Sequence, residues 1–408
     1  MKHVIFITPF FTENAKQFLA GLSRLRSPIR LSVISQDAEE HLPEDIRLGI
    51  GRFWKVKDIQ SYQEMLEACK SLRDEIGPIN RCLVVNEQVQ ESVASIRESL
   101  DIPGMRPATA RNYRNKKRMK EVLEKSQVPI AKNYKVLNQD DAQKAIKKIG
   151  LPLVAKPIRG AAAQETFRIL DESAWQRFLD RHVGESKGPW LLEQMLSGQE
   201  YSCDTFCLNG KMLFRTYNQY IPSPLEVIEN DWIQWQVILP NPAGGPDFED
   251  IRKLADKTLK ALGAEDGWSH LEWFRLNDGS IAVSEAAMRP PGAQFTTMVS
   301  RAADFDSIEA WATLMIDGEF QIPKQKYAVG TAYLRGMGEG TVSGIHGWEA
   351  IQQQYASLIC DHRIPAIGTP KSQTYEGEGF VIVRHPDTEL VRSVLLDIVS
   401  TVRVFLSK

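Results

Sequence analysis

The sequence contains few cysteines, and their spacing disfavours several kinds of site. Zinc centres and dithiol redox centres need closely spaced pairs such as Cys-x-x-Cys, and a disulfide framework needs an even number of cysteines. The 408-residue chain has no such pair, and its count of five is odd. A reducing, cytoplasmic location is therefore expected. The cysteines are Cys69, Cys82, Cys203, Cys207 and Cys360.

Long apolar runs and an excess of charge of one sign are also missing. No apolar stretch approaches the roughly 20 residues that a membrane-spanning helix needs, and the apolar start is shorter than a signal-peptide core. The 50 basic and 52 acidic side chains give a formal net charge of -2, so we expect neither nucleic acid nor a membrane as a partner. The composition is typical of a soluble globular protein, and the length predicts two or three domains.

The N-terminal hundred residues lack the glycine-rich fingerprint of dinucleotide-binding domains. Short apolar runs alternate here with amphipathic segments such as Tyr62–Ile76, which predicts βαβ units and a mostly parallel, Rossmann-like sheet. A dinucleotide site needs Gly-x-Gly-x-x-Gly after the first strand, but Thr-Pro-Phe-Phe-Thr stands at residues 8–12. This disfavours an NAD(P)-dependent oxidoreductase and favours a substrate-binding scaffold. The expected strands are His3–Thr8, Arg30–Ser35, Arg52–Val56 and Arg81–Val85.

Further along, the pattern changes from helical to antiparallel. A strand is expected to end at Lys156, an awkward place for a purely structural charge. Asn209 and Gly210 separate two apolar runs and predict a tight hairpin. The last eighty or so residues, with a helix from Thr388 onward, are expected to form a small α+β cap. The helices expected before them are Arg111–Lys125, Gln139–Ile149, Glu172–Val183 and Phe248–Leu262.

Two glutamates are predicted to face each other across a second hairpin. The apolar runs Trp268–Leu276 and Ile281–Ala287 flank the sequence Asn-Asp-Gly-Ser. If the Asp-Gly dipeptide forms a two-residue turn, counting outward places Glu272 opposite Glu285. Cross-strand neighbours are only about 4.5–5.5 Å apart at Cβ, and like charges there are destabilising, so a cation is needed between them. Arg289 projects to the same side if the strand continues regularly.

Two carboxylates with an arginine beyond them suit a divalent cation that bridges phosphate oxygens. Magnesium takes one or two carboxylates plus substrate phosphates, and arginine binds phosphate through two parallel hydrogen bonds. The alternative is a solvated surface pair or a different register, because the turn type sets the register. Apolar neighbours such as Leu271 and Val283 predict that one face of the hairpin is buried.

The region from about Arg106 to Gly292 resembles the ATP-grasp superfamily in a series of motifs that follow in the family's order. Residues 115–119, Asn-Lys-Lys-Arg-Met, are similar to the Asp-Lys-x-x-Met element, and residues 150–157 to a strand with a phosphate-binding lysine. Residues 159–164 stand where the family has a small-residue loop, and residues 192–204 resemble the segment that joins two lobes around adenine. Residues 270–272 and 285–289 resemble the motifs that hold magnesium and triphosphate.

This resemblance implies a cavity for ATP and for a substrate. Lys116 and Lys156 would bind phosphates together with the small-residue loop, and Lys156 and Arg289 would be catalytic. The implied nucleotide-binding residues are Lys116, Lys156, Gly160, Ala161, Ala162, Glu193, Met195 and Glu200, of which Glu193 and Met195 would read adenine and Glu200 the ribose. Glu272 and Glu285 would hold Mg²⁺, or Mn²⁺ in its place. The implied substrate contacts are Glu87, His270, Arg289 and Gly292.

The resemblance also implies the organisation of the chain. The expected fold is a Rossmann-like N-terminal domain over residues 1–107, a two-lobed ATP-grasp domain over 108–322 and the α+β cap over 323–408. Residues 128–196 would form a lid lobe that closes over the substrate. Small molecules are the expected partners, and a homodimer is the expected assembly if the protein is not a monomer.

Three departures from the family pattern bear on the chemistry. Asn115 replaces the common aspartate, and Gly160 is followed by three alanines rather than by several glycines. Ala287 replaces the usual metal-binding asparagine, which leaves a second magnesium one ligand short. His270 would face Ala287 in the counted register, and either this side chain or a water would take the vacant position.

The function implied is that of an ATP-dependent carboxylate–amine ligase that works through an acyl phosphate, with an amino acid as the expected substrate. Within the superfamily, the alternative is a biotin-carboxylase-like or purine-pathway-like enzyme that activates bicarbonate or another small carboxylate. A second alternative is an ATP-binding regulatory protein without catalysis, which Ala287 and the alanine loop suggest.

Overall fold

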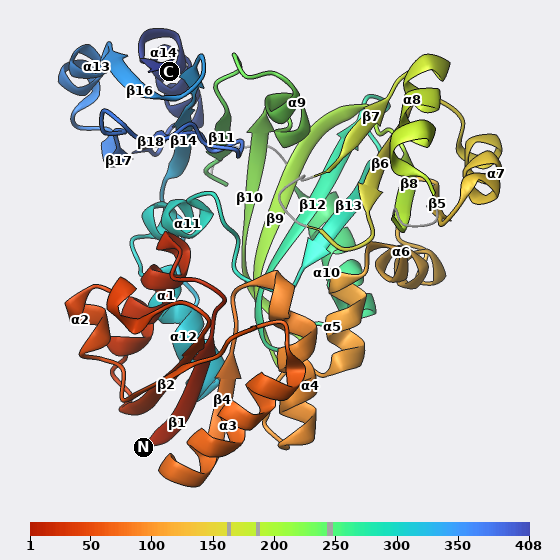
Figure 1. Ribbon diagram of the computed structural model, residues 1–408. Helices are drawn as coiled ribbons and strands as arrows, with labels where there is room; N and C mark the ends of the chain where they lie inside the picture. The colour runs from red at the N-terminus through yellow and green to blue at the C-terminus, as the bar shows by residue number, and fades with distance from the viewer. Residues whose placement is uncertain (161–164, 185–187, 243–247) are drawn as a thin grey trace.

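The computed structural model describes residues 1–160, 165–184, 188–242 and 248–408. A parallel N-terminal sheet and a small antiparallel sheet lie on either side of a long central sheet, which continues into the C-terminal region (Figure 1). None of the helices in these ranges is long and apolar enough to cross a membrane.

The N-terminal sheet has four parallel strands in the order β3-β2-β1-β4, which confirms the predicted βαβ units. Helices cover both faces, because Val4 and Phe6 belong to one hydrophobic core and Ile5 and Ile7 to another. The elements are β1 (Lys2–Ile7), α1 (Glu13–Ser23), β2 (Ile29–Ser35), η1 (Glu39–His41), α2 (Glu44–Arg47), β3 (Arg52–Lys55), α3 (Tyr62–Ile76), β4 (Ile79–Leu83), η2 (Glu87–Val89) and α4 (Gln90–Ser99).

The single basic helix predicted over Arg111–Lys125 is wrong, because the chain breaks at Asn115. The break separates α5 (Pro107–Arg114) from α6 (Lys116–Lys125). Asn115 is extended, and its side chain accepts a hydrogen bond from the Arg118 backbone N–H at 2.9 Å, so it caps α6. Lys116 thereby becomes the first residue of a new helix.

The lid sheet is antiparallel in the order β5-β8-β6-β7, with two helices packed on it. Its core includes Trp175 and Phe178 from a helix and Leu192 from a strand. The helix predicted over Gln139–Ile149 is confirmed. The elements are β5 (Asn133–Val136), α7 (Gln139–Ile149), β6 (Leu153–Pro157), β7 (Phe167–Ile169), α8 (Glu172–His182) and β8 (Trp190–Gln194).

The central sheet has eight strands in the order β13-β12-β9-β10-β11-β14-β18-β17. Asn209 and Gly210 have φ angles of 51° and 72°, which confirms the predicted two-residue hairpin turn between β9 and β10. The elements of its first part are β9 (Gly198–Leu208), β10 (Lys211–Ile221), α9 (Pro224–Glu229), β11 (Gln236–Leu239), α10 (Glu249–Leu262), β12 (Gly267–Leu276) and β13 (Ile281–Ala287).

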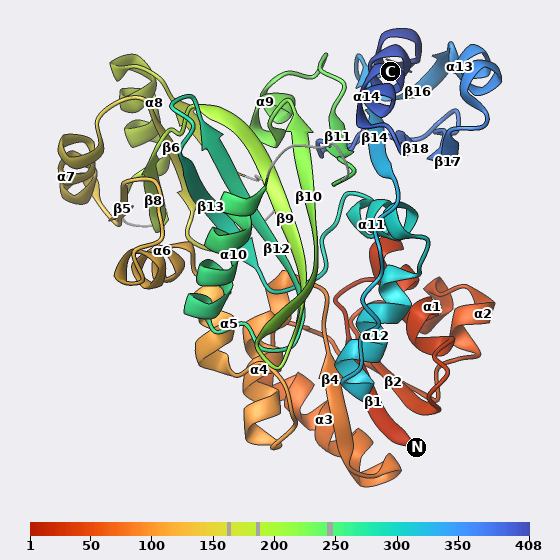
Figure 2. The same cartoon turned by 180° about the vertical axis from the view of Figure 1, so that it is seen from behind.

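The C-terminal region forms the expected α+β unit, and three of its strands also extend the central sheet. Before it, α11 (Phe295–Ala303) leads to α12 (Ser307–Asp317), which packs against α1 and β4 and so joins the N-terminal sheet to the rest (Figure 2). The remaining elements are β14 (Ala328–Leu334), β15 (Gly336–Met337), β16 (Thr341–His346), α13 (Trp348–Tyr355), β17 (Ile359–Arg363), β18 (Gly379–His385), α14 (Thr388–Thr401) and β19 (Arg403–Ser407).

The hairpin of β12 and β13 differs from the prediction at its turn. The loop has three residues instead of two, since the Leu276 N–H donates to the Ser280 carbonyl at 2.8 Å and the Gly279 N–H donates to the Leu276 carbonyl at 2.9 Å. Gly279 has a φ of 85°, in the left-handed region that such loops require. This register alone would place Glu272 opposite Ser284.

A β-bulge then restores the predicted pairing. The register shifts by one residue beyond Trp273, so that Glu272 faces Glu285 and His270 faces Ala287. The facing glutamates are thus confirmed although the predicted turn is wrong. The extra residue in the turn and the extra residue in the bulge offset each other.

The bulge is held in place by a buried lysine. The Lys120 ammonium donates to the Ser284 carbonyl at 2.7 Å and lies 2.8 Å from Oε1 of Glu193 on β8. Lys120 is only 1% exposed. Beside it, the Val283 N–H donates to the Pro129 carbonyl at 2.9 Å. One ammonium therefore links α6, the lid sheet and the hairpin.

The substitution Lys120→Met is expected to destabilise the protein by roughly 3 kcal/mol, because it leaves the bulge carbonyl unsatisfied and removes one of the two cations that neutralise a buried carboxylate. The exposed Lys125 of the same helix is the control, and Lys125→Met is expected to change stability by less than about 0.5 kcal/mol. Urea unfolding followed by tryptophan fluorescence measures both. Equal stability of the two variants would contradict this role.

The start of β9 depends on a glycine, because a Cβ at Gly198 would lie 2.1 Å from the Arg275 carbonyl oxygen. Gly198→Ala is therefore expected to cost more than about 2 kcal/mol of stability. Gly279→Ala is the matched control on the same hairpin. It has a positive φ but no atom within 4 Å of the added Cβ, so only a backbone cost of about 1–2 kcal/mol is expected. Thermal unfolding compares the two variants, and a milder effect at Gly198 would refute the argument.

Candidate active site

A cavity of about 680 Å³ lies where the central sheet, the lid sheet and the N-terminal region meet. It collects every predicted site residue that falls within the described ranges. Ala161 and Ala162, which were also predicted to bind phosphate, lie outside the described residues. The predicted residues that line the cavity are Glu87, Lys116, Lys156, Gly160, Glu193, Met195, Glu200, His270, Glu272, Glu285, Arg289 and Gly292.

The facing glutamates lie on the cavity floor, with Lys116 next to one of them. The Lys116 ammonium donates to Oε1 of Glu285 at 2.5 Å and to the Gly160 carbonyl at 3.1 Å. On the other strand, Nε2 of His270 lies 3.6 Å from Oε1 of Glu272. Burial alone would raise the pKa of Glu272, but the neighbouring cations outweigh it and lower this pKa. The repulsion expected from the facing pair is therefore offset by protein cations.

This pair fits the partial ligand set that Mg²⁺ uses beside a polyphosphate. Within the described ranges, no group of three or more His, Cys, Asp or Glu side chains is arranged to hold a metal ion. A cation at Glu272 and Glu285 would therefore need oxygen ligands from a substrate. Magnesium is commonly bound in this way, through one or two carboxylates and the phosphates of the substrate.

His270 is held by a buried aspartate that the sequence did not single out. Its Nδ1 lies 2.5 Å from Oδ1 of Asp204 on β9, and the amide of Asn218 donates to the other carboxylate oxygen at 2.7 Å. Burial would lower the pKa of His270, but the carboxylates of Asp204 and Glu272 outweigh it and raise the pKa to about 9. His270 thus pairs with Ala287 in the sheet register, while its ring is oriented by Asp204.

Glu193 orients Lys156. Both residues were predicted to bind nucleotide. The Lys156 ammonium and the Glu193 carboxylate form a close ion pair, and Lys120 binds the second carboxylate oxygen. Burial opposes ionisation of Glu193, but the two lysines lower its pKa to about 2. The side chain predicted to read adenine is therefore engaged by two lysines, and its contact with adenine stays a prediction.

Glu87 and Arg289, both predicted to contact substrate, form an ion pair across the cavity wall. Nε of Arg289 lies 3.3 Å from Oε1 of Glu87, and Nη1 of Arg114 lies 3.2 Å from Oε2. Arg289 also donates to the Pro290 carbonyl at 2.9 Å. The N-terminal sheet and the hairpin thus meet at a buried carboxylate with two arginines.

The expected adenine and ribose end contains Met195 and Glu200. The Met195 N–H donates to the Pro152 carbonyl at 3.2 Å, so this backbone donor has a partner within the lid. Burial and the nearby charge of Glu272 raise the pKa of Glu200 to about 8. A carboxyl of this kind can act as a hydrogen-bond donor or acceptor near neutral pH.

Several residues in or beside the cavity were missed by sequence reasoning, and two of them carried a signal. Lys120 lies four residues after Lys116 and hence on the same helix face. Asp204 lies four residues after Glu200 on β9, so the strand places both on one face. Tyr375 and Glu376, in a C-terminal loop, carried no such signal. They line the cavity but lie far along the chain from its other residues.

Three cations, Lys116, Lys156 and Arg289, therefore surround two facing carboxylates in one cavity. Such an arrangement can bind a polyanion together with a divalent cation, and it can stabilise negative charge that moves between oxygens. Chemistry of this kind needs positioned charges rather than a protein nucleophile.

Comparison with known proteins agrees with this geometry. The ATP-grasp domain model matches residues 121–305. The L-arginine-specific L-amino acid ligase of Bacillus subtilis is 29% identical over 244 residues, which are 58% of this chain and 58% of that protein. The similarity therefore spans little more than half of the relative's length.

Two solved structures share the fold across nearly the whole chain. The L-amino acid ligase from Bacillus licheniformis has a TM-score of 0.78 at 17% identity, covering 100% of this chain and 99% of that chain. The N5-carboxyaminoimidazole ribonucleotide synthetase from Thermotoga maritima has a TM-score of 0.71 at 16% identity and covers 100% of both chains. With residues 121–305 matched in sequence and the fold matched in space, this chain contains an ATP-grasp domain.

Proposed function

We propose that this chain is an ATP-dependent ligase that joins the carboxylate of an amino acid to an amine and releases ADP and phosphate. The observation that carries this proposal is the facing pair of Glu272 and Glu285 beside Lys116, Lys156 and Arg289 in one cavity. The amino-acid class of the substrate is supported by the similar proteins, two of which are L-amino acid ligases.

ATP would lie with its base near Met195, its ribose at Glu200 and its phosphates toward Lys116, Lys156 and Gly160. Glu272 and Glu285 would hold Mg²⁺, or Mn²⁺, which neutralises phosphate charge and orients the terminal phosphate when bound. Glu193 would also act at the phosphates indirectly, by orienting Lys156.

The reaction would proceed in two balanced steps. A carboxylate oxygen of the amino acid attacks the γ-phosphorus, the bond to the bridging oxygen breaks, and ADP leaves. The nitrogen of the amine then attacks the acyl carbon, phosphate leaves, and the amine loses a proton. Lys156 and Arg289 stabilise the charge on the transferring group, and the lid lobe excludes the water that would hydrolyse the acyl phosphate.

The competing function is the activation of bicarbonate or another small carboxylate. The carboxyaminoimidazole ribonucleotide synthetase has a similar fold, which makes this alternative worth testing. Incubation with ATP, Mg²⁺ and pooled amino acids distinguishes the two. Phosphate release that needs both an amino acid and an amine supports the ligase. Release that needs bicarbonate supports the alternative, and nucleotide binding with no turnover in any pool supports a regulatory protein.

The five free cysteines fit the cytoplasmic location that we propose.

Glu285→Ala is expected to reduce ligation on the order of 10²-fold or more, because it removes one carboxylate of the cation site and the partner of Lys116. Phosphate release at saturating ATP and Mg²⁺ measures the effect, and chelation of the metal should give the same loss in the unaltered protein. Glu265→Ala, at an exposed position before β12, is the control and should retain activity. Full turnover by Glu285→Ala would refute the assignment of the site.

A further inference from the structure

Beyond the facing glutamates, the cavity is walled by aromatic rings. The rings of Tyr220 and Trp235 have centroids 5.7 Å apart, Phe295 lies 6.0 Å from Tyr220, and Tyr375 lies 4.7 Å from Trp235. All four line the cavity. The Tyr220 hydroxyl is 3.4 Å from Nε2 of His270. This aromatic wall (Tyr220, Trp235, Phe295 and Tyr375) therefore begins at the site proposed for phosphoryl transfer.

A carboxylate without a protein cation also lines the cavity. Among the described residues, no side chain forms a hydrogen bond or an ion pair with the Glu376 carboxylate. Burial raises the pKa of Glu376, and only the more distant Arg363 opposes this. The carboxylate of Glu226 on α9 lines the same cavity and likewise has no ion-pair partner in the described ranges. By contrast, a basic side chain lies beside each of Glu87, Glu193, Glu272 and Glu285, whereas Glu200, at the expected ribose end, has no ion-pair partner in the described ranges.

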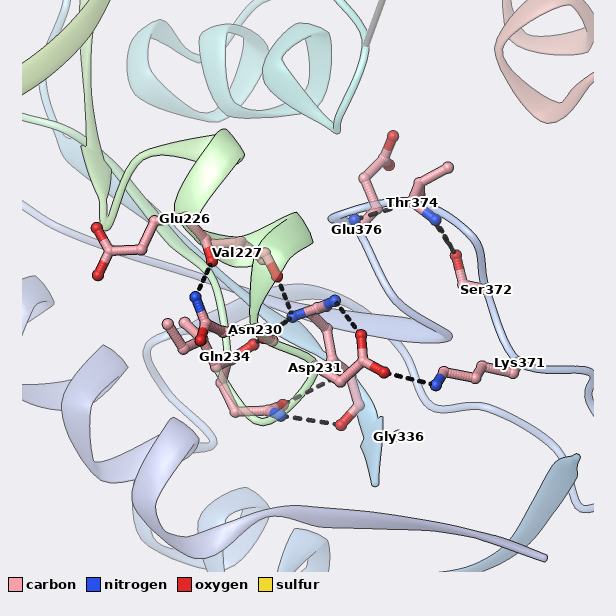
Figure 3. A network of polar contacts seen from close by, with 12 residues as sticks. Glu226, Val227, Asn230, Asp231, Gln234, Gly336, Lys371, Ser372, Thr374 and Glu376 are labelled. Carbon is pink, nitrogen blue, oxygen red and sulfur yellow. Dashed lines mark hydrogen bonds and ion pairs between the residues drawn. The ribbon is translucent and has the colours of Figure 1, made fainter. Parts of the chain in front are cut away.

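The backbone that presents Glu376 is firmly held (Figure 3). Its own N–H donates to the Thr374 hydroxyl at 3.3 Å, and Lys371 pairs with Asp231 at 2.9 Å. Glu378 accepts the backbone N–H groups of Gly336 and Ser372. Figure 3 shows the Glu376 side chain directed away from these contacts. The loop is therefore preorganised by these hydrogen bonds, and the Glu376 carboxylate takes no part in them.

Arg335 joins this loop to the segment that carries Glu226. Its Nη1 donates to three backbone carbonyls, those of Val227 at 2.9 Å, Asn230 at 3.0 Å and Ile233 at 2.8 Å. Figure 3 shows the Glu226 side chain pointing away from this network as well. Glu376 and Glu226 thus lie on two braced segments that both line the cavity, and their side chains point in different directions in Figure 3.

Tyr375 connects this part of the cavity to the reaction centre. Burial raises the pKa of Tyr375, and the charges that act on it include Glu376 as well as Glu272 and Arg289. The ring therefore lies within electrostatic reach of both groups of charges. A molecule with its carboxylate beside Arg289 would run along the aromatic wall toward Glu376.

From this juxtaposition we infer that the amino acid activated by the enzyme has a cationic side chain, a guanidinium or an ammonium group, bound by Glu376 against the aromatic wall. This inference rests on the proposed ligase function and specifies its acid substrate.

The chemistry of the wall favours a cation over a neutral side chain. Aromatic faces attract cations through their quadrupole, and a carboxylate adds a charge-assisted hydrogen bond. A neutral side chain of the same shape would leave the carboxylate desolvated without a partner, which is unfavourable. Selection between two such substrates is therefore expected to be strong.

The test measures which acids are activated, with hydroxylamine as the trapping amine. L-Arginine is compared with its neutral isostere L-citrulline, and L-lysine with N-ε-acetyl-L-lysine, each with ATP and Mg²⁺. The hydroxamate formed identifies the acid that was phosphorylated. We expect kcat/KM for each cationic acid to exceed that of its neutral partner on the order of 10²-fold.

Glu376→Gln should remove most of this difference through a higher KM for L-arginine and a lower KM for L-citrulline, because the neutral amide is not left as an unpaired buried charge. Glu349→Gln, at an exposed position on α13, is the matched control and should keep the preference. Equal use of arginine and citrulline by the unaltered protein, or an undiminished preference in Glu376→Gln, would overturn the inference and leave the ligase proposal standing. No hydroxamate with any acid would overturn both.

Discussion

The buried ammonium of Lys120 is the contact on which the rest of the site depends. It neutralises Glu193 in the lid sheet and donates to the bulge carbonyl of Ser284 in the hairpin. Removal of such charges from water costs several kcal/mol per ion, so the arrangement is favourable only with every partner in place. Because Glu193 also binds Lys156, the position of a proposed phosphate ligand and the register of the proposed metal site are set together.

Ion pairs between side chains also neutralise most of the charges that line the cavity. Lys116 forms an ion pair with Glu285, and Arg289 forms one with Glu87. A divalent cation bound at Glu285 would take over that carboxylate and leave the Lys116 ammonium to a phosphate oxygen. The binding of nucleotide and metal at the proposed site would thereby be coupled, since each would neutralise a group that the other releases from a protein ion pair. In the part of the chain that the structure describes, the cavity carboxylates of Glu200, Glu226 and Glu376 fall outside this balance, and Glu376 is the one proposed to bind the amino-acid side chain.

Much of the fold and the grouping of the site could be predicted from local patterns. Alternation along strands and the order of motifs identify the residues that meet in the cavity. The break at Asn115 was missed, because its charged neighbours look like one continuous helix face. The facing glutamates were predicted from a turn that does not exist, and the bulge at Ser284 corrects the count. That bulge depends on Lys120, a contact between residues 164 positions apart, which no local pattern reveals.

The substitution at Ala287 acquires a structural meaning from the same comparison. An asparagine there would offer an oxygen to a second cation, but alanine offers none. His270, its cross-strand partner, does not replace that oxygen, because its Nδ1 lies 2.5 Å from Asp204 and its Nε2 already faces Glu272. The two remaining carboxylates suffice for one cation that also binds phosphate oxygens. The neighbouring positive charges of Lys156 and Arg289 can supply the neutralisation that a second cation would give, so we expect catalysis with one tightly held divalent ion.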